Sequence, residues 1–274
     1  MNISGNTKVL AVIGRPACHS LSPKIHNFLL ENLGMDYVYT AFEPDSMKHA
    51  ADAIRSLGIK GVNVTAPFKV EAMEAVDVLS ENAALSGSVN TIVNEDGVLT
   101  GYSTDGEGLY ASMDRAGISI ENKKILVLGA GGVAKPVCVM LKNKGASEVV
   151  IKNRTESKAI EICTDLNKKM NTDIFRTYSK SESFDIIINT TSVGLGTMET
   201  PVEDTNLFES ASAAVDLIYH PSKTKFLADA EEKGLKILNG LGMLVFQGVI
   251  AYEHFTGVKV PDSLSEEVLK LLNE

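Results

Sequence analysis

Short apolar runs alternate with helical patterns along the first part of the chain. Residues 8–14, 37–42 and 61–65 are largely apolar over strand-like lengths, which favours buried strands. Between them, apolar side chains recur at helical spacing within residues 22–34 and 47–57, as in helices that bury one face. This alternation predicts an α/β fold in which helices cover a mainly parallel sheet.

The alternation restarts after Gly101. Before that point, residues 89–93 and 98–102 flank Glu95-Asp96-Gly97, which is typical of a hairpin turn. Beyond a helix at 106–116, the chain returns to strands separated by helical stretches. We expect strands at 124–129, 149–152, 184–189, 213–218 and 235–238, a helix ending near Lys144, and helices at 241–255 and 264–272.

Composition limits the classes of function. The 274 residues are 44% hydrophobic and 22% charged, which is ordinary for a soluble globular protein. A net charge of −9 argues against nucleic acid as a partner, although local basic groups could still bind a small anion. Cys18, Cys138 and Cys163 lack metal-ligand spacing, so we expect reduced thiols and no metal site.

We also expect a cytoplasmic protein. The apolar run from Val9 to Ile13 ends at Gly14-Arg15-Pro16 and is too short for a signal peptide. No apolar run approaches the length of a membrane span.

A glycine-rich turn follows the strand predicted at 124–129. Residues 125–134 read ILVLGAGGVA, a strand that runs directly into the pattern G-x-G-x-x-A. In this context Gly129 permits a tight turn, Gly131 lets the backbone approach a pyrophosphate, and Ala134 allows close helix packing. The alternative is a structural turn that only joins the strand to the helix. The combination of strand, turn and helix favours a dinucleotide site formed by Gly129, Ala130, Gly131, Gly132, Val133 and Ala134.

The next strand indicates which dinucleotide is bound. An NAD site normally carries an acidic side chain about 20 residues after the glycines. Here the strand ends in Lys152-Asn153-Arg154-Thr155, with Lys158 one turn later. Arginine can clamp a 2′-phosphate, whereas basic residues at a helix start oppose the helix dipole and need another reason. We therefore expect NADP, bound in part by Asn153, Arg154, Thr155 and Lys158.

Polar residues gather at the predicted strand ends of the first domain. Ser20 and Ser22 lie at a helix start, where Ser22 is sufficiently explained as the side-chain cap and Ser20 is not. Residues 63–69, NVTAPFK, end a buried strand in polar groups and place Lys69 just beyond it. Asn90-Thr91 and Thr104-Asp105 add an amide, hydroxyls and a carboxylate. Ligands bind at this edge of α/β sheets, so these groups together favour a substrate site over scattered surface charges.

Taken together, these segments make the chain resemble the shikimate dehydrogenase family over nearly its whole length. The matching segments, in the family's order, are H-S-x-S-P at 19–23, N-V-T-x-P-F-K at 63–69, V-N-T at 89–91, T-D-G at 104–106, G-A-G-G at 129–132, N-R-T at 153–155, and G-L-G-M-L at 240–244 followed by Gln247. The resemblance implies NADPH-dependent reduction of 3-dehydroshikimate to shikimate in aromatic amino-acid and chorismate biosynthesis.

The resemblance also implies roles for single residues. Ser20 and Ser22 would hold the substrate carboxylate, and Lys69 with Asp105 would form the catalytic pair. Leu217 and Gly240 would lie against the nicotinamide end of the cofactor. The remaining substrate contacts implied by the family are Thr65, Asn90, Tyr219 and Gln247. Lys69 as an ammonium can donate a proton to the developing alkoxide.

Three positions depart from the family pattern. Ser103 stands where many members have Asn, which weakens any role assigned there. The glycine turn continues into Lys135-Pro136, where an Arg is common. Lys158 replaces another Arg, so a planar clamp on the 2′-phosphate becomes a point charge.

The expected organisation is a substrate-binding domain at residues 1–104, completed by 241–274, and a Rossmann-type NADP-binding domain at 105–240. Two alternatives stay open: a quinate/shikimate dehydrogenase with broader substrate or NAD use, and a non-catalytic dinucleotide sensor. The sensor is disfavoured because it has no need for Lys69 beside Asp105. A homodimer is compatible with the sequence, which carries no direct sign of oligomeric state.

Overall fold

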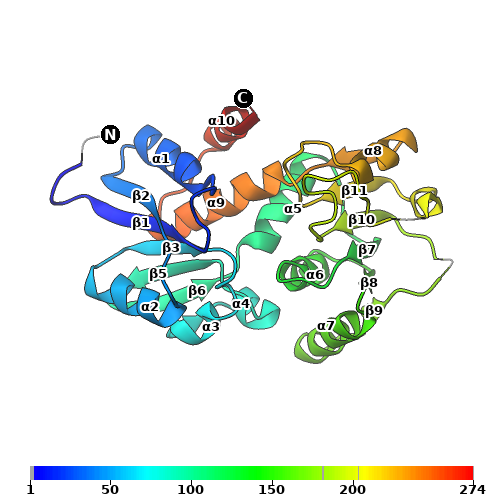
Figure 1. The fold of residues 1–274 in the computed structure, drawn as a ribbon, viewed down its shortest axis with the longest axis horizontal. Coiled ribbons are helices and arrows are strands. Elements are labelled where there is room, and N and C mark those ends of the chain that lie inside the picture. Colours follow the sequence, from blue (N-terminus) through cyan, green and yellow to red (C-terminus); the bar gives the residue numbers. More distant parts are fainter. Residues whose placement is uncertain (1–2, 181, 203, 274) are drawn as a thin grey trace. The chain divides into compact units, whose positions relative to one another are not determined.

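A computed structural model describes residues 3–180, 182–202 and 204–273. The described residues divide into two compact units, each with its own sheet (Figure 1). The first unit extends to Gly108 and resumes at Val245, and the second runs from Leu109 to Leu244. Both boundaries fall inside helices, α5 (Asp105–Arg115) and α9 (Leu241–Thr256). No helix among the described residues is both long and apolar enough to cross a membrane.

The first unit contains a six-stranded sheet in the order β2-β1-β3-β5-β6-β4. Its strands are β1 (Lys8–Ile13), β2 (Tyr37–Phe42), β3 (Gly61–Val64), β4 (Val78–Leu79), β5 (Thr91–Glu95) and β6 (Val98–Tyr102). Strand β1 pairs in parallel with β2 and β3, and β4 in parallel with β6, whereas β5 is antiparallel to both neighbours. The predicted hairpin and the mainly parallel direction are confirmed.

Helices cover both faces of this sheet. They are α1 (Ser22–Asn32), α2 (Met47–Ser56), α3 (Ala72–Ala75), α4 (Glu81–Ser86) and α10 (Asp262–Asn273), joined by parts of α5 and α9. In α2 the apolar residues Met47, Ala50, Ala51 and Ile54 share one buried face, and the Ser46 hydroxyl accepts the His49 N–H at the start of the helix. Figure 1 shows α2, α3 and α4 on one face of the sheet and α1 on the other.

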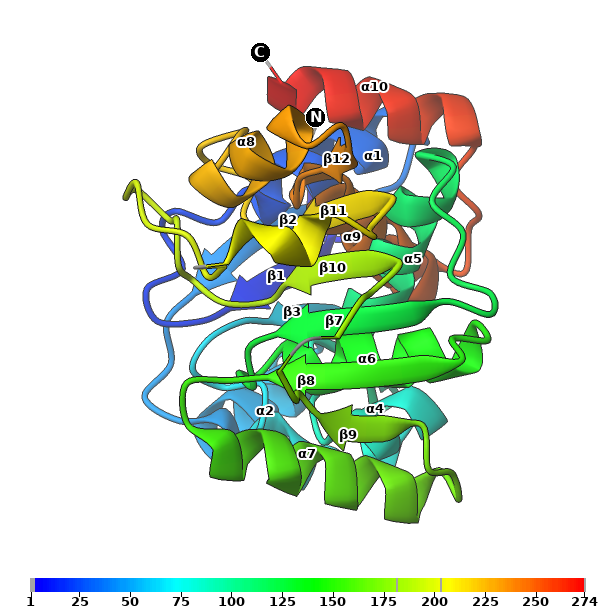
Figure 2. The ribbon, with the colours of Figure 1, turned by 90° about the vertical axis from the view of Figure 1, so that its right-hand side faces the viewer.

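The second unit contains a fully parallel six-stranded sheet in the order β12-β11-β10-β7-β8-β9 (Figure 2). Its strands are β7 (Lys124–Leu128), β8 (Glu148–Lys152), β9 (Phe175–Thr177), β10 (Ile186–Asn189), β11 (Ala213–Asp216) and β12 (Lys236–Leu238). Counted within the unit, this is the order 3-2-1-4-5-6 of dinucleotide-binding folds. The predicted Rossmann-type fold is confirmed.

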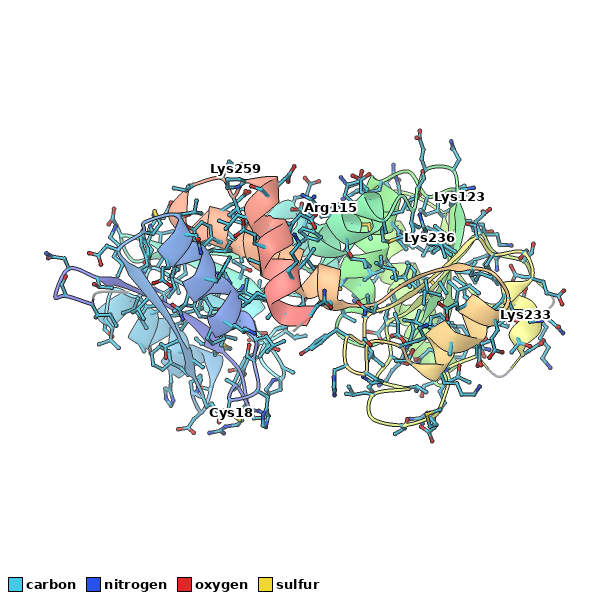
Figure 3. All side chains as sticks on the ribbon, turned by 90° about the horizontal axis from the view of Figure 1, so that it is seen from above. Cys18, Arg115, Lys123, Lys233, Lys236 and Lys259 are labelled. Carbon is cyan, nitrogen blue, oxygen red and sulfur yellow. The ribbon has the colours of Figure 1, made fainter. Side chains whose placement is uncertain are left out.

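Apolar helix faces bury this second sheet. The helices are α6 (Ala134–Asn143), α7 (Glu156–Lys169), α8 (Lys225–Glu232) and the short 3₁₀ helix η1 (Thr205–Phe208). Phe226 and Leu227 of α8 and Phe208 of η1 join strand residues in one core. Among the cysteines, Cys138 and Cys163 are buried, whereas Cys18 is exposed on the surface of the first unit (Figure 3).

Candidate functional site

The predicted catalytic pair is formed in the first unit. The Lys69 ammonium lies 2.6 Å from Asp105 Oδ2, and the lysine side chain is 26% exposed while the carboxylate is only 7% exposed. Lys69 follows β3, and Asp105 begins α5 directly after β6. Both strands run in the same direction, so their carboxyl ends lie along one edge of the sheet. The pair therefore combines a buried carboxylate with a cation that solvent or substrate can reach.

Asn90 connects this pair to its surroundings. It precedes β5, whose antiparallel direction brings its amino end to the same edge. The Asn90 amide donates to Asp105 Oδ1 at 3.0 Å and to Thr104 Oγ1 at 2.9 Å, and its oxygen accepts the Thr104 N–H at 2.8 Å. A longer contact of 3.4 Å reaches Gln247 Oε1 on α9. Asn90, Asp105 and Gln247 are thus brought together by side-chain hydrogen bonds.

A second layer of polar groups supports Asn90 from within the sheet. Asn63 is buried, donates to Thr91 Oγ1 at 3.1 Å and accepts from the Tyr39 hydroxyl at 2.7 Å. Tyr39 in turn stacks on the buried ring of His26, with centroids 4.2 Å apart. Sequence reasoning singled out Asn63 and Thr91 only as polar motif residues. An Asn inside an otherwise apolar strand was the signal for this supporting role.

The structure corrects the predicted role of Ser22 as a helix cap. Leu21 occupies the N-cap position without a side-chain hydrogen bond, and Ser22 is the first residue of α1. The Ser20 hydroxyl accepts the Ser22 N–H at 3.2 Å, so Ser20 supports the helix start. Ser22 is instead buried, and its hydroxyl bonds to the Tyr39 side chain. Burial raises the pKa of Tyr39, and the hydrogen bond with Ser22 opposes this rise. Ser20 stays half-buried, which leaves its hydroxyl accessible.

Thr65 completes the set in the first unit. It follows β3, and its N–H donates to the Ile13 carbonyl at 2.8 Å. A Cβ added to Gly14 would clash with the methyl group of Thr65, so only glycine fits beside Thr65. Ser103, which departs from the family pattern, is buried, and its hydroxyl has no hydrogen-bond partner among the described residues.

In the second unit, the glycine turn begins where β7 ends. Gly129 has a φ of +111°, and an added Cβ would lie 2.7 Å from Thr190 Oγ1, so glycine is required there. Gly131 and Gly132 are exposed, and nothing lies within 4 Å of a Cβ on either. Ala134 is fully buried at the first residue of α6. The turn therefore offers open backbone at a helix N-terminus, where a pyrophosphate fits.

The predicted 2′-phosphate residues lie between β8 and α7. Arg154 and Lys158 are both exposed and form no ion pair with another described residue. Asn153 donates through its amide to the Thr155 carbonyl at 2.8 Å, which shapes the turn. Lys135, in contrast, pairs with Asp165 of α7 at 2.8 Å and so helps join α6 to α7. Two cations without an ion-pair partner among the described residues, Arg154 and Lys158, thus lie after the end of β8.

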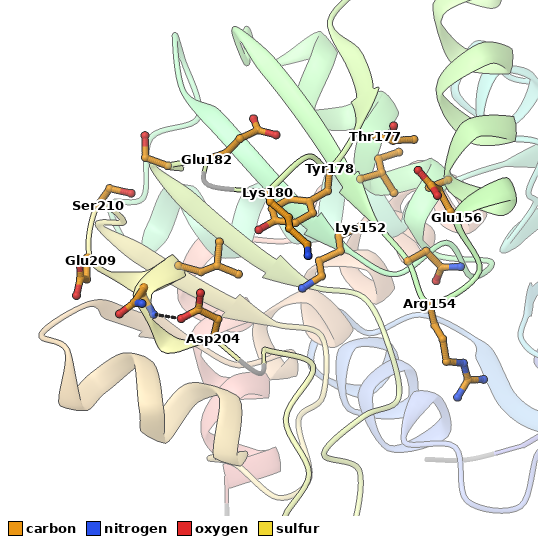
Figure 4. A pocket seen from close by; sticks show the side chains of 16 residues that line it. Lys152, Arg154, Glu156, Thr177, Tyr178, Lys180, Glu182, Asp204, Glu209 and Ser210 are labelled. Atoms are coloured by element: carbon orange, nitrogen blue, oxygen red, sulfur yellow. Dashed lines mark hydrogen bonds between the residues drawn. The ribbon is translucent and has the colours of Figure 1, made fainter.

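A cavity of about 970 Å³ adjoins this turn (Figure 4). Lys152 lies over the Tyr178 ring, 5.0 Å from its centroid, on one wall. Arg154 extends away from the other labelled side chains (Figure 4). The cavity is lined by residues 151–154, 156, 159, 177, 178, 180, 182, 183, 204, 206, 207, 209 and 210. Sequence reasoning found Asn153 and Arg154 but not Tyr178, which lies just after the three-residue strand β9.

The segment after β11 carries the remaining predicted residues. Leu217 follows Asp216 directly, and Tyr219 is 38% exposed. A Cβ on Gly240 would meet the Leu217 carbonyl oxygen, and the Gly240 N–H donates to the Ile218 carbonyl at 3.1 Å. These contacts bring Leu217 and Gly240 together. Tyr219 belongs to the second unit, whereas the other predicted substrate residues belong to the first.

Three family descriptions match successive parts of the chain. Residues 12–92 match the shikimate dehydrogenase substrate binding domain, residues 112–215 match shikimate / quinate 5-dehydrogenase, and residues 240–270 match the shikimate 5′-dehydrogenase C-terminal domain. Together they cover both units.

Individual proteins agree with these matches. A shikimate dehydrogenase (NADP⁺) from Alkaliphilus metalliredigens is 42% identical over 94% of this chain and 95% of its own length. A crystal structure of shikimate dehydrogenase in complex with NADP⁺ superposes with a TM-score of 0.91 at 35% identity, covering 99% of this chain and 97% of that one. Shikimate 5-dehydrogenase from Listeria monocytogenes, in complex with shikimate and NAD, has the same TM-score of 0.91 at 34% identity, covering 99% and 98% of the two chains.

Proposed function

The chain belongs to the shikimate dehydrogenase family, and on this premise we propose that it reduces 3-dehydroshikimate to shikimate with NADPH, using Lys69 and Asp105 as its catalytic pair. The reaction is reversible and belongs to aromatic amino-acid and chorismate biosynthesis. The observation that supports the catalytic assignment best is the 2.6 Å contact between the accessible Lys69 ammonium and the buried Asp105 carboxylate.

Bound NADPH supplies the hydride, and the chain supplies the proton and the orientation. The Lys69 ammonium donates its proton to the substrate oxygen as negative charge develops there. Asp105 holds the ammonium through Oδ2, while Asn90 fixes the other oxygen of the same carboxylate at 3.0 Å. Because both carboxylate oxygens are engaged, the lysine is held in one orientation before the reaction begins.

The substrate residues divide by chemistry. Ser20 and Ser22 offer hydroxyl groups to the substrate carboxylate at the start of α1. Amide and hydroxyl groups of Asn90, Thr65 and Gln247 suit the ring hydroxyls. Tyr219 offers a phenol hydroxyl as a further hydrogen-bonding group.

The cofactor residues fit NADP. Open backbone at Gly131 and Gly132 leaves room for the pyrophosphate at the N-terminus of α6. Arg154 and Lys158 are exposed cations that suit the 2′-phosphate, and Leu217 with Gly240 suits the nicotinamide end. These roles assign most of the substrate contacts to the first unit and the NADP contacts to the second.

The cytoplasm is the compartment that fits this pathway. A homodimer is the assembly to test first, by light scattering of the purified chain.

Near-ultraviolet absorbance tests the function directly. The purified chain is mixed with shikimate or quinate and with NADP or NAD, in all four combinations. The expected result is rapid NADPH formation from shikimate and NADP. Comparable rates with quinate or NAD would indicate the broader dehydrogenase. Absence of any signal, with cofactor binding intact, would indicate a non-catalytic sensor and overturn the proposal.

A further inference from the structure

A buried carboxylate lies at the carboxyl edge of the second sheet. Asp216 ends β11 and Asn189 ends β10, and both side chains are fully buried. The Asn189 amide donates to Asp216 Oδ1 at 3.0 Å, and the Thr224 hydroxyl donates to Oδ2 at 2.6 Å. No ion pair joins Asp216 to any described cation. Burial raises the pKa of this carboxyl group, so its retention within the core calls for a reason.

The same carboxylate fixes the backbone that follows β11. Asp216 Oδ1 also accepts the Ile218 N–H at 3.0 Å. On either side of this bond, the Leu217 N–H donates to the Asn189 carbonyl at 3.0 Å, and the Ile218 carbonyl accepts the Gly240 N–H at 3.1 Å. The segment Leu217–Ile218 is therefore held by Asn189 of β10 and by Gly240, which lies just after β12. Tyr219 extends from this segment, whose start is fixed by the buried acid.

Asn189 extends the network to the glycine turn. Its side-chain oxygen accepts the Thr191 N–H at 3.0 Å and the Thr191 hydroxyl at 2.7 Å. The adjacent Thr190 hydroxyl donates to the Leu128 carbonyl at 2.8 Å, directly before Gly129. The loops after β7, β10 and β11 are thus joined by one set of hydrogen bonds, at the edge where dinucleotides bind.

We propose that Asp216 is a positioning residue that sets Leu217, Gly240 and Tyr219 in place for the nicotinamide end of the cofactor and for the substrate. The inference rests on the proposed function, because that function gives these three residues their roles. Asp216 is buried and acts through the segment it holds. An asparagine would supply only one acceptor oxygen, and its NH₂ group would face the hydroxyl of Thr224 or the N–H of Ile218.

The test separates the two ends of the cofactor. In Asp216→Asn we expect kcat to fall on the order of 10–100-fold, the effect of misplacing reacting groups by about an ångström. The KM for shikimate should rise because Tyr219 moves. The Kd of adenosine 2′,5′-bisphosphate, which lacks nicotinamide, should change less than about twofold, since Arg154 and Lys158 lie on another segment.

Asp185→Asn is the matched control. Asp185 lies just before β10 at the opposite edge of the same sheet, where its carboxylate accepts the Lys124 N–H at 2.8 Å. It should leave kcat and both affinities near the unmodified values. If Asp216→Asn does not fold, Thr224→Val removes the hydroxyl bond to Oδ2 together with the N-cap bond from the Leu227 N–H of α8, and it should give a smaller loss of kcat in the same direction. Thr224→Ser keeps both bonds and should restore kcat.

The outcomes distinguish the two proposals. Unchanged kcat in Asp216→Asn, or equal weakening of nucleotide fragment and turnover, would show that Asp216 only stabilises the unit. Absence of turnover in the unmodified chain would instead overturn the proposed function itself. A Tyr219→Phe variant with unchanged KM for shikimate would remove Tyr219 from the proposal and leave Leu217 and Gly240 to be tested by kcat.

Discussion

Replacing Lys69 tests the catalytic pair most directly. In Lys69→Ala the proton donor is lost, and we expect kcat to fall by about 10²–10⁴-fold, the usual range for a positioned acid or base. That loss corresponds to about 2.7–5.5 kcal/mol in the activation barrier. The KM for shikimate should change far less, because an interaction made mainly in the transition state lowers kcat.

The structure also predicts a cost in stability. Removing the ammonium leaves Asp105 Oδ2 without its 2.6 Å partner, while Oδ1 keeps the amide of Asn90 at 3.0 Å. Because this carboxylate is 7% exposed, the loss should be on the order of 1–3 kcal/mol in the free energy of unfolding. Urea unfolding measures it, so kinetics can be compared at a temperature where every variant is folded.

Two further variants complete the experiment. Lys69→Arg keeps the charge beside Asp105 but cannot release its proton near neutral pH, so it should regain stability and not turnover. Lys24→Ala is the control, since the Lys24 ammonium donates to the Leu271 carbonyl at 2.8 Å between α1 and α10 and has no assigned catalytic role. If Lys69→Arg keeps most of kcat and both Lys69 variants act chiefly on KM, Lys69 is an electrostatic anchor and the proton-donor role is refuted.

Three more substitutions test separate features. Arg154→Ala should weaken NADPH at least about tenfold and NADH hardly at all, because a charged hydrogen bond to the 2′-phosphate contributes about 1.5–3 kcal/mol; equal weakening by fluorescence titration would contradict this. Ser20→Ala should raise the KM for shikimate and lower the melting temperature slightly, since Ser20 also accepts the Ser22 N–H; an unchanged KM would place the substrate carboxylate elsewhere. Burial lowers the pKa of His26 from 6.5 to about 3, so the unfolded chain gains a proton that the folded chain does not as the pH falls between these values. His26 should therefore lower the free energy of unfolding by about 1.4 kcal/mol for each unit by which the pH falls within this window. His26→Phe should remove that part of the pH dependence in urea unfolding, and an identical pH dependence in the two proteins would contradict this prediction.

The fold could be predicted where apolar runs were long. The four apolar residues at the end of β7 lead into a glycine turn, in which Gly129 has a positive φ and Gly131 and Gly132 have open surroundings, as expected at a helix start. Strand β4 has two residues and β9 has three, and such lengths carry no usable periodicity. The helices α3 and α4 were missed for the same reason, since one or two turns show no repeat.

Side-chain networks were harder to predict than single site residues. Motifs identified Lys69 and Asp105 because lysine and aspartate after strand ends suggest chemistry. The side-chain partners of Asn63 come from two other strands, β2 and β5, and this set depends on register, which the sequence does not state. Ser22 was assigned as a cap because serine before proline is typical of helix starts. Its burial beside Tyr39 is a tertiary contact that outweighed the local pattern.

Each unit contains an asparagine–aspartate pair, and we assign the two pairs different roles. In the first, the Asn90 amide donates to Asp105 at 3.0 Å, and in the second, the Asn189 amide donates to Asp216 at the same distance of 3.0 Å. What differs is the partner of the remaining oxygen, which is the accessible ammonium of Lys69 in one case and the buried hydroxyl of Thr224 in the other. We propose that the accessible cation makes the first carboxylate part of proton transfer. The second carboxylate has a neutral partner in the core and accepts hydrogen bonds only from backbone and side-chain groups among the described residues. For this reason we assign catalysis to Asp105 and positioning to Asp216.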